Sequence, residues 1–234
     1  MLHALRCLYA AQVRLARASS SSSWRRRQAD DQYVRKARAQ GKVSRAAFKW
    51  SELDAKHKIV TPGVKRVLEL GAAPGSWTRE IGDALVRGSP AAELVTVDPG
   101  AMSPQVVAWL QSSGLAHVHH SMVMEELELD ELGVFDVVAS DMAPAATGHR
   151  GTDRARAEAL FEAALALADA VLVRGGSMVA KIFRNGMERA ALDEARELFA
   201  KVVLVKPKAS RSESREMFLV AKGFAGSESG AGGR

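Results

Sequence analysis

Only one of the 234 residues is a cysteine, Cys7. A single thiol excludes an internal disulfide framework and any cysteine-based zinc site. The sequence also lacks an apolar run approaching the roughly 18 residues of a membrane-spanning helix, so we expect no membrane association. Acidic side chains are absent from residues 1–29, although six arginines lie there. These absences predict a domain held together by its apolar core and preceded by a basic segment.

A histidine cluster is the one group that resembles a metal site. His117, His119 and His120 lie close together on an expected strand. They lack an acid or a cysteine at the spacing of a ligand set, so we predict exposed or core histidines and no metal.

The chain has enough apolar residues for one domain. Its hydrophobic content of 47% supports a single α/β unit with a sizeable core. The net charge of +6 is unevenly placed: residues 1–45 contain 11 lysines and arginines and two acids, whereas the remaining residues contain 22 and 25. The basic character therefore belongs to the N-terminal segment.

Residues 1–28 have the composition of a transit peptide. Arginines alternate with leucine, valine and alanine, and a serine run follows at residues 19–23. An amphipathic segment that is rich in arginine and serine and free of acids is typical of import signals. We predict import into the mitochondrial matrix, with a plastid or the cytoplasm as alternatives. A disordered basic arm that binds RNA is the other interpretation.

A second basic segment, residues 31–49, mixes helix-forming residues with closely spaced cations. Such a stripe can bind nucleic-acid phosphates, although a charge run more often marks a solvated helix face. The candidate RNA-binding residues are Arg35, Lys36, Arg38, Lys42 and Arg45.

The most informative stretch is Val-Leu-Glu-Leu-Gly-Ala-Ala-Pro-Gly-Ser-Trp, residues 67–77. Residues 66–70 predict a buried parallel strand, and a helical pattern runs from 76 to about 85. A strand, a glycine turn and a helix N-terminus form a cradle for a nucleotide-like ligand. A second strand, residues 94–98, ends in Asp98, at the spacing from which an acid binds a ribose hydroxyl.

The loop of this cradle differs from a dinucleotide-binding loop. Its glycines do not match G-x-G-x-x-G, and Pro74 lacks the backbone donor that a pyrophosphate would use. A ligand with adenosine but no phosphates fits better, which favours S-adenosylmethionine (SAM) over NAD. The alternative is a turn that merely connects a strand to a helix.

The rest of the chain continues as alternating strands and helices. We expect helices over residues 103–112, 153–172 and 188–199, and strands over 116–120, 135–141, 177–183, 202–206 and 216–221. No helix separates the last two strands, so they should pair antiparallel. We predict an α/β, Rossmann-like fold over residues 29–224, with a mostly parallel seven-stranded sheet ending in an antiparallel strand, and a disordered tail over 225–234.

Several charged residues should meet at one edge of this sheet. Ligands of open α/β sheets bind beyond the carboxyl ends of the strands, where Asp98, Asp141 and Lys181 are expected. Lys181 interrupts an apolar strand, which is costly unless the charge is paired or used. Glu216 opens the antiparallel strand near the same edge, and Lys49 precedes the first strand. Ordinary surface charge is the alternative for Lys49 or Glu216 taken alone.

Six motifs carry a resemblance to a known family. In order, they are Ser-Arg-Ala-Ala-Phe-Lys, Leu-Gly-Ala-Ala-Pro-Gly-Ser-Trp, Val-Asp-Pro, Ser-Asp-Met-Ala-Pro, Gly-Gly-Ser-Met-Val-Ala-Lys-Ile-Phe and Ser-Arg-Ser-Glu-Ser-Arg-Glu-Met-Phe-Leu-Val-Ala. With these motifs, residues 31–224 resemble the FtsJ/RrmJ family of ribosomal RNA 2′-O-ribose methyltransferases, which have the class I SAM-dependent fold.

The resemblance implies site residues. A catalytic Lys-Asp-Lys-Glu tetrad falls on Lys49, Asp141, Lys181 and Glu216. The implied cofactor-binding positions are Pro74, Gly75, Ser76, Trp77, Asp98 and Asp141. The chain departs from the family pattern at Met122, where an acid often lies near the adenine, and at Pro99, where an aliphatic residue is usual.

The resemblance also implies an activity: SAM-dependent methylation of a ribose 2′-hydroxyl in large-subunit ribosomal RNA, at a uridine, by a monomer acting on RNA or on a preribosomal particle. Lys181 acts either as a base, if desolvation and neighbouring cations lower its proton affinity, or as an electrostatic orienting group. The alternatives are a tRNA anticodon-loop ribose methyltransferase, an RNA-binding assembly factor without catalysis and, least favoured, a NAD-dependent oxidoreductase.

Overall fold

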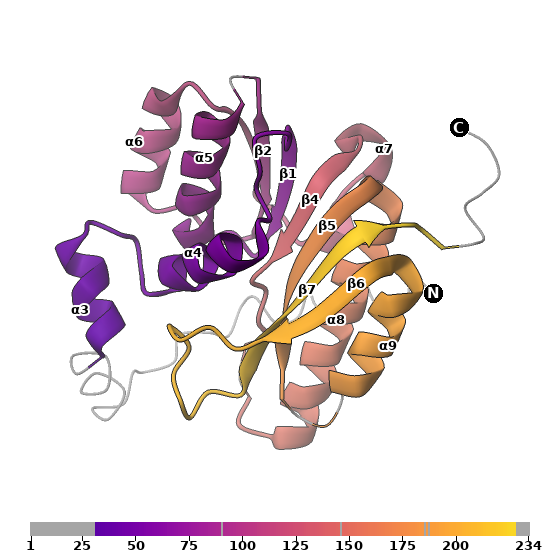
Figure 1. Ribbon diagram of the computed structural model, residues 1–234. Coiled ribbons are helices and arrows are strands. Elements are labelled where there is room, and N and C mark those ends of the chain that lie inside the picture. The colour runs from indigo at the N-terminus through magenta and orange to yellow at the C-terminus, as the bar shows by residue number, and fades with distance from the viewer. Residues whose placement is uncertain (1–30, 90, 146, 185, 187, 228–234) are drawn as a thin grey trace.

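The computed structural model describes residues 31–227 except 90, 146, 185 and 187. A seven-stranded sheet lies between two layers of helices (Figure 1). The strands are β1 (Arg66–Leu70), β2 (Glu93–Val97), β3 (Ala116–His120), β4 (Phe135–Ser140), β5 (Leu172–Phe183), β6 (Phe199–Val205) and β7 (Glu216–Phe224). The helices are α3 (Gln32–Ala39), α4 (Ala46–His57), α5 (Ser76–Gly88), α6 (Pro104–Ser113), α7 (Leu129–Leu132), α8 (Arg150–Val171) and α9 (Glu188–Leu198), with a 3₁₀ turn at Met124–Glu126.

The strand order is β3-β2-β1-β4-β5-β7-β6. The first five pair in parallel, and β7 is antiparallel to both of its neighbours. The predicted α/β fold, with a mostly parallel seven-stranded sheet, is therefore confirmed, as is the antiparallel pairing of the last two strands. Chain order alone did not indicate that β7 inserts between β5 and β6, which leaves β6 at the edge.

The two faces of the sheet bury separate apolar cores. Leu68 and Leu70 of β1 face a core that includes α8 and α9. Val67, one residue away, faces the core beneath α4, α5 and α6. Successive side chains of a strand point to opposite faces, and all three are fully buried. A strand that is covered on both faces reads as a continuous apolar run, which is the pattern of a parallel sheet.

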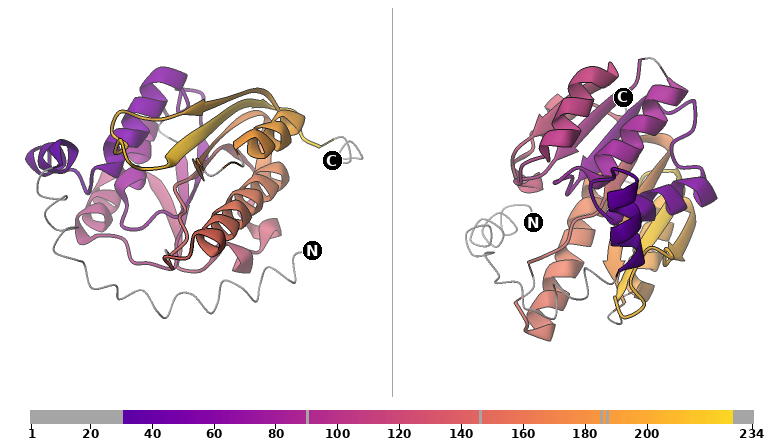
Figure 2. Two further views of the ribbon diagram at one scale, coloured as in Figure 1. Left: turned by 90° about the horizontal axis from the view of Figure 1, so that it is seen from below. Right: turned by 90° about the vertical axis from the view of Figure 1, so that its left-hand side faces the viewer.

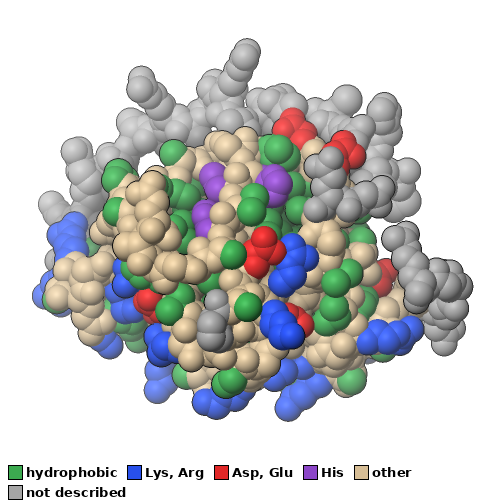
Figure 3. All heavy atoms as spheres, turned by 90° about the horizontal axis from the view of Figure 1, so that it is seen from above, with side chains coloured by type: hydrophobic (Ala, Val, Ile, Leu, Met, Phe, Trp, Pro, Cys, Tyr) green, Lys and Arg blue, Asp and Glu red, His purple; other side chains and the backbone are tan. Residues whose placement is uncertain are grey.

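The two ends of the sheet differ in character. Figure 3 shows the end where the parallel strands begin, on which acidic and basic side chains are intermixed. There Arg66 pairs with Glu93 at 2.6 Å, and Asp136 accepts hydrogen bonds from the backbone of Lys65 and Arg66. The left view of Figure 2 looks from the other side, onto the carboxyl ends, with the loop between β6 and β7 beside α3. The candidate site lies on that second side.

The histidines of β3 bond to a neighbouring strand. The rings of His117 and His119 stack with centroids 6.5 Å apart and share the Thr96 hydroxyl at 2.9 and 3.0 Å. Burial and the neighbouring His119 lower the pKa of His117. Within the described residues, no group of three or more histidine, cysteine, aspartate or glutamate side chains is placed to hold a metal ion.

Three predictions concern the ends of the chain or membranes. The predicted transit peptide, residues 1–28, lies outside the described residues, as does the predicted tail from residue 228 onward. Over the part of the chain that the structure covers, every helix is too short or too polar to cross a bilayer.

Candidate active site

The loop after β1 takes a shape that requires glycine. Gly71 and Gly75 have φ angles of 74° and 102°, a region that other residues rarely adopt. A Cβ on Gly71 would lie 2.8 Å from the backbone nitrogen of Met142, and one on Gly75 would lie 2.9 Å from a Val106 methyl group. The absence of side chains thus lets β4 and α6 approach the loop closely.

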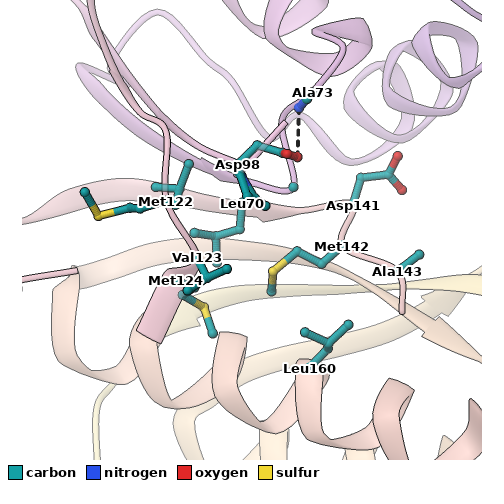
Figure 4. A pocket seen from close by; sticks show the side chains of 13 residues that line it. Leu70, Ala73, Asp98, Met122, Val123, Met124, Asp141, Met142, Ala143 and Leu160 are labelled. Carbon is teal, nitrogen blue, oxygen red and sulfur yellow. Dashed lines mark hydrogen bonds between the residues drawn. The ribbon is translucent and has the colours of Figure 1, made fainter. Parts of the chain in front are cut away.

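A cavity of about 300 Å³ opens beside this loop, at the carboxyl ends of β1, β2 and β4 (Figure 4). Asp98 and Asp141 provide its carboxylates, and Met142 and Leu160 lie below them in this view. The complete lining is Leu70, Gly71, Ala73, Val97, Asp98, Pro99, Met122, Val123, Met124, Asp141, Met142, Ala143 and Leu160.

Asp98 is held by the backbone around it. Its two oxygens accept hydrogen bonds from the amides of Ala73, at 3.0 Å, and Gly100, at 2.6 Å. One carboxylate thereby connects the loop after β1 to the turn after β2. This places the acid at the cavity, as the strand-end position predicted.

The four predicted catalytic residues come together as two ion pairs. Lys49 on α4 contacts Glu216 at 2.6 Å. Lys181 on β5 contacts Asp141 at 2.7 Å and donates to the Asp141 backbone carbonyl at 2.6 Å. All four side chains are less than one-fifth exposed. The structure therefore assembles a buried, charge-balanced group next to the cavity, which Asp141 also lines.

The strand pairing explains why Glu216 reaches this group. Glu216 lies opposite Phe183, and Lys181 lies opposite Phe218, so Glu216 and Lys181 share one face of the sheet. Burial opposes ionisation of Glu216, but the charge and hydrogen bond of Lys49 and the charge of Lys181 hold its pKa below the usual value. Glu216 is thus an anion that two lysines stabilise.

The buried acid Glu69 is a site feature that sequence reasoning missed. It is 1% exposed, and one of its oxygens accepts a hydrogen bond from the Thr78 hydroxyl at 2.7 Å. Burial raises its pKa to about 8, and the charges of Asp141 and Asp98 act in the same direction. Glu69 is therefore largely protonated at neutral pH beneath the loop. In the sequence, an acid inside an otherwise apolar strand is the feature that could have indicated this buried group.

The side chains of two predicted cofactor residues support α4. Ser76 shares a 2.7 Å hydrogen bond with Ser44, and the Trp77 indole donates to the Ala46 carbonyl at 3.1 Å. The Trp77 ring packs between Trp50 and Phe218 with centroids 4.9 and 5.4 Å away. The cavity lining includes neither residue, nor Pro74 or Gly75. These side chains dock the helix that carries Lys49, and cofactor contact by residues 74–77 stays a prediction.

The basic residues around α3 fall into two groups. Lys42 pairs with Glu80 at 2.6 Å, and Arg45 pairs with Asp31. Both side chains are partly buried. The side chains of three others are exposed and form no ion pair with any described residue. These are Arg35, Lys36 and Arg38.

Comparison with known proteins identifies the family. Residues 42–224 match the FtsJ-like methyltransferases. The chain belongs to this family. A Rhizobium meliloti protein named ribosomal RNA large subunit methyltransferase E is 42% identical over 209 residues, which cover 89% of this chain and 83% of the relative. A Granulibacter bethesdensis protein of the same name is 41% identical, covering 89% of this chain and 86% of the relative.

Solved structures agree on the fold. A Plasmodium falciparum protein described as a ribosomal RNA methyltransferase superposes with a TM-score of 0.64 at 23% identity, over 78% of this chain and 98% of that one. A likeness of this degree supports the class I methyltransferase fold.

This FtsJ-like methyltransferase uses SAM as its methyl donor. The cavity volume of about 300 Å³ lies at the lower end of the range for small-molecule pockets, and the strand-end acids Asp98 and Asp141 suit the hydroxyls and the cationic end of SAM. Asp98 would hold the ribose hydroxyls, and Asp141 would face the methionine end. Beyond Asp98, the lining side chains Pro99, Met122 and Val123 carry no carboxylate or amide, so the adenine has an apolar and polarisable surface to pack against.

Proposed function

We propose that this enzyme transfers a methyl group to a ribose 2′-hydroxyl of large-subunit ribosomal RNA, at a uridine. The observation that carries the proposal is the meeting of Lys49, Glu216, Lys181 and Asp141 beside the SAM cavity. A ribose hydroxyl is a poor nucleophile at neutral pH, so its reaction depends on alignment and on a group that handles its proton. Two lysines that carboxylates hold in fixed positions meet both needs.

The contacts of each residue suggest its role. When bound, SAM supplies the methyl group of its sulfonium: the attacking oxygen donates an electron pair to that methyl carbon, the carbon–sulfur bond breaks, and a neutral thioether remains. Lys181, fixed by two Asp141 oxygens, either orients the hydroxyl as an ammonium or, after it has released one of its own protons to solvent, accepts the hydroxyl proton. Lys49 adds positive charge that stabilises the oxygen as its proton leaves, and Glu216 keeps Lys49 in place.

The names of the relatives support large-subunit ribosomal RNA as the substrate. The exposed cations of α3 can bind the phosphates of free RNA or of RNA within a ribosomal particle. We propose a monomer acting on the ribosomal large subunit or its RNA.

The test uses the full chain, radiolabelled SAM, and large-subunit RNA or subunits that lack the modification. We expect label in alkali-resistant dinucleotides, because a 2′-O-methyl group blocks cleavage of the adjacent phosphodiester. Digestion to nucleosides should place the label on uridine. Label released by alkali or located on a base would contradict ribose methylation. Label on tRNA with none on the ribosomal substrates would favour the anticodon-loop alternative.

We also propose a mitochondrial location, on the composition of residues 1–28. A reporter fused to these residues should enter mitochondria, because an arginine-rich amphipathic segment without acids suits that import route. A matched fusion with Arg6, Arg14 and Arg17 changed to glutamate should remain in the cytosol. Cytosolic residence of the unaltered fusion would instead favour the RNA-binding arm.

A further inference from the structure

The loop between β6 and β7, residues 206–215, is fastened to the N-terminal helices. Glu52 of α4 accepts hydrogen bonds from the backbone of Lys208, at 2.6 Å, and of Ala209, at 3.0 Å. Arg45 donates to the Ala209 carbonyl. Ala209 is fully buried and packs in a small core with Ala37 and Phe48. The loop therefore has a fixed position against α3 and α4.

One carboxylate joins the three elements. Asp31 caps α3, because one of its oxygens accepts hydrogen bonds from the amides of Tyr33, at 3.0 Å, and Val34, at 3.3 Å. The other oxygen pairs with Arg45 and, at 3.1 Å, with Arg211 of the loop. Partial burial opposes ionisation, but Arg211 and Arg45 hold the pKa of Asp31 below its usual value. Asp31 thus stays charged and keeps both arginines in place.

Above this junction, α3 and the loop enclose an open groove of about 660 Å³. Tyr33 lines it, and its ring is tilted against Phe48 with centroids 5.7 Å apart. Arg35 contributes a cation from the helix, and Lys208 contributes one from the loop. Both are exposed and form no ion pair within the described part of the chain. The lining is Asp31, Gln32, Tyr33, Arg35, Arg45, Lys208, Ser210, Arg211, Ser212 and Glu213.

The charge of the groove is unbalanced. Four of its lining residues are cations and two are acids, and one of those acids, Asp31, is occupied by two arginines. Two exposed cations without an ion pair to any described residue, beside an aromatic ring, are the combination that holds a single nucleic-acid strand, with phosphates on the cations and a base on the ring.

We propose that this groove binds a single-stranded RNA segment flanking the target nucleotide, with phosphates at Arg35 and Lys208 and a base stacked on Tyr33. The inference rests on the proposed RNA substrate. Two connections direct the strand to the catalytic group: the loop leads into Glu216 at the start of β7, and Lys49 lies one helical turn beyond Arg45. RNA bound along the groove therefore runs toward the Lys49–Glu216 pair.

The test measures binding of a fluorescent 20-nucleotide single-stranded RNA to the full chain over a range of salt concentrations. In the Arg35→Ala/Lys208→Ala variant, the slope of log affinity against log salt should become shallower by roughly 1.4, since each lost phosphate contact contributes about 0.7 for a single strand. The Arg189→Ala/Arg196→Ala variant removes the same charge from α9 and should keep the wild-type slope. SAM affinity should be unchanged in both variants.

A second pair of variants tests the ring. Tyr33→Phe keeps a stacking surface and should bind RNA as the wild type does. Tyr33→Leu should lose about 5- to 150-fold in affinity, the usual value for a base stacked on an aromatic side chain. Thermal unfolding of both variants checks that α3 remains in place.

Several outcomes would overturn the groove. The first is an equal salt slope for the Arg35→Ala/Lys208→Ala and α9 variants. The second is an equal RNA affinity for Tyr33→Leu and Tyr33→Phe. The third is binding of poly-glutamate as tightly as RNA, which would indicate an acidic protein partner. A wild-type protein that binds no RNA would overturn the proposed function as well. If the wild-type protein methylates RNA but the Arg35→Ala/Lys208→Ala variant keeps the wild-type salt slope, only the proposal of the groove is contradicted.

Discussion

The carboxyl end of the sheet has two halves built in different ways. Over β1, β2 and β4, a glycine loop, apolar side chains and two strand-end acids form a cavity. Over β5 and β7, the site consists of buried ion pairs contributed by four separate elements. The first half comes mainly from short contiguous motifs, whereas the second requires the complete topology. We expect the cofactor half to control binding and the ion-paired half to control the rate of transfer.

The largest effect that would separate the halves is expected from Lys181→Ala. Turnover should fall by roughly 10²–10⁴-fold, the usual contribution of a positioned acid–base group. Affinities for SAM and RNA should change little, because the interaction matters in the transition state. Lys181→Arg should also fail, since a guanidinium cannot release its proton and has a different shape. Single-turnover kinetics measure this, and a near wild-type rate would remove Lys181 from the mechanism.

The reverse result is expected for Asp98→Ala. Affinity for SAM should fall roughly 10- to 150-fold, the range for losing hydrogen bonds to a charged group, while affinity for RNA stays the same. Calorimetric titration with SAM measures the first, and RNA binding provides the control. Asp98→Asn, which keeps one acceptor, should lie between the wild type and Asp98→Ala. Equal SAM affinity in all three proteins would contradict the assignment of Asp98 to the ribose.

The Lys49–Glu216 pair should stabilise the fold in a pH-dependent way. The pKa of Glu216 is lower in the folded protein than its reference value of 4.5. Its contribution to stability is therefore present above pH 4.5 and is lost as the pH falls through the folded value. Glu216→Gln should flatten this acid limb of the stability curve, measured by urea unfolding at several pH values. An unchanged limb would show that the pair contributes little.

Replacement of Glu69 should change the pH dependence of stability on the alkaline side, opposite to Glu216, and this is the smallest effect that we expect. Its pKa is raised to about 8 in the folded protein, so its contribution is complete below pH 4.5 and declines as the pH rises through 8. Glu69→Gln cannot ionise and still accepts the Thr78 hydrogen bond. The variant should resist alkaline destabilisation better than the wild type, while turnover at pH 7 is nearly the same. A steeper alkaline decline in the variant would contradict a protonated Glu69.

The sequence predicted most of the fold because, up to β6, strands alternate with helical segments along the chain. It also predicted all four residues of the ion-paired group and the acid at the end of β2. It did not predict the position of β7 between β5 and β6, because apolar periodicity determines which face is buried and not which strands are neighbours. β5 begins at Leu172, five residues before its predicted start.

The side-chain partners were harder to predict than the side chains themselves. Local charge predicts Arg45 as an RNA contact but does not indicate its partners: Asp31 is 14 residues away, and Arg211 completes the cluster from the other end of the chain. Trp77 belongs to a cofactor motif, but its indole is 1% exposed and packs against α4. Both cases depend on contacts between distant segments, which local patterns do not specify.

The placement of β7 has a consequence for the order in which the protein is completed during synthesis. A nascent chain that has emerged as far as β5 already contains the glycine loop, Asp98, Asp141 and Lys181. Glu216, and the loop that anchors α3, follow only with the last segment, which must enter between β5 and β6. The growing polypeptide therefore contains the cavity acids Asp98 and Asp141 before it contains the counter-ion of Lys49, and we expect methyl transfer only after the final strand has been made and inserted.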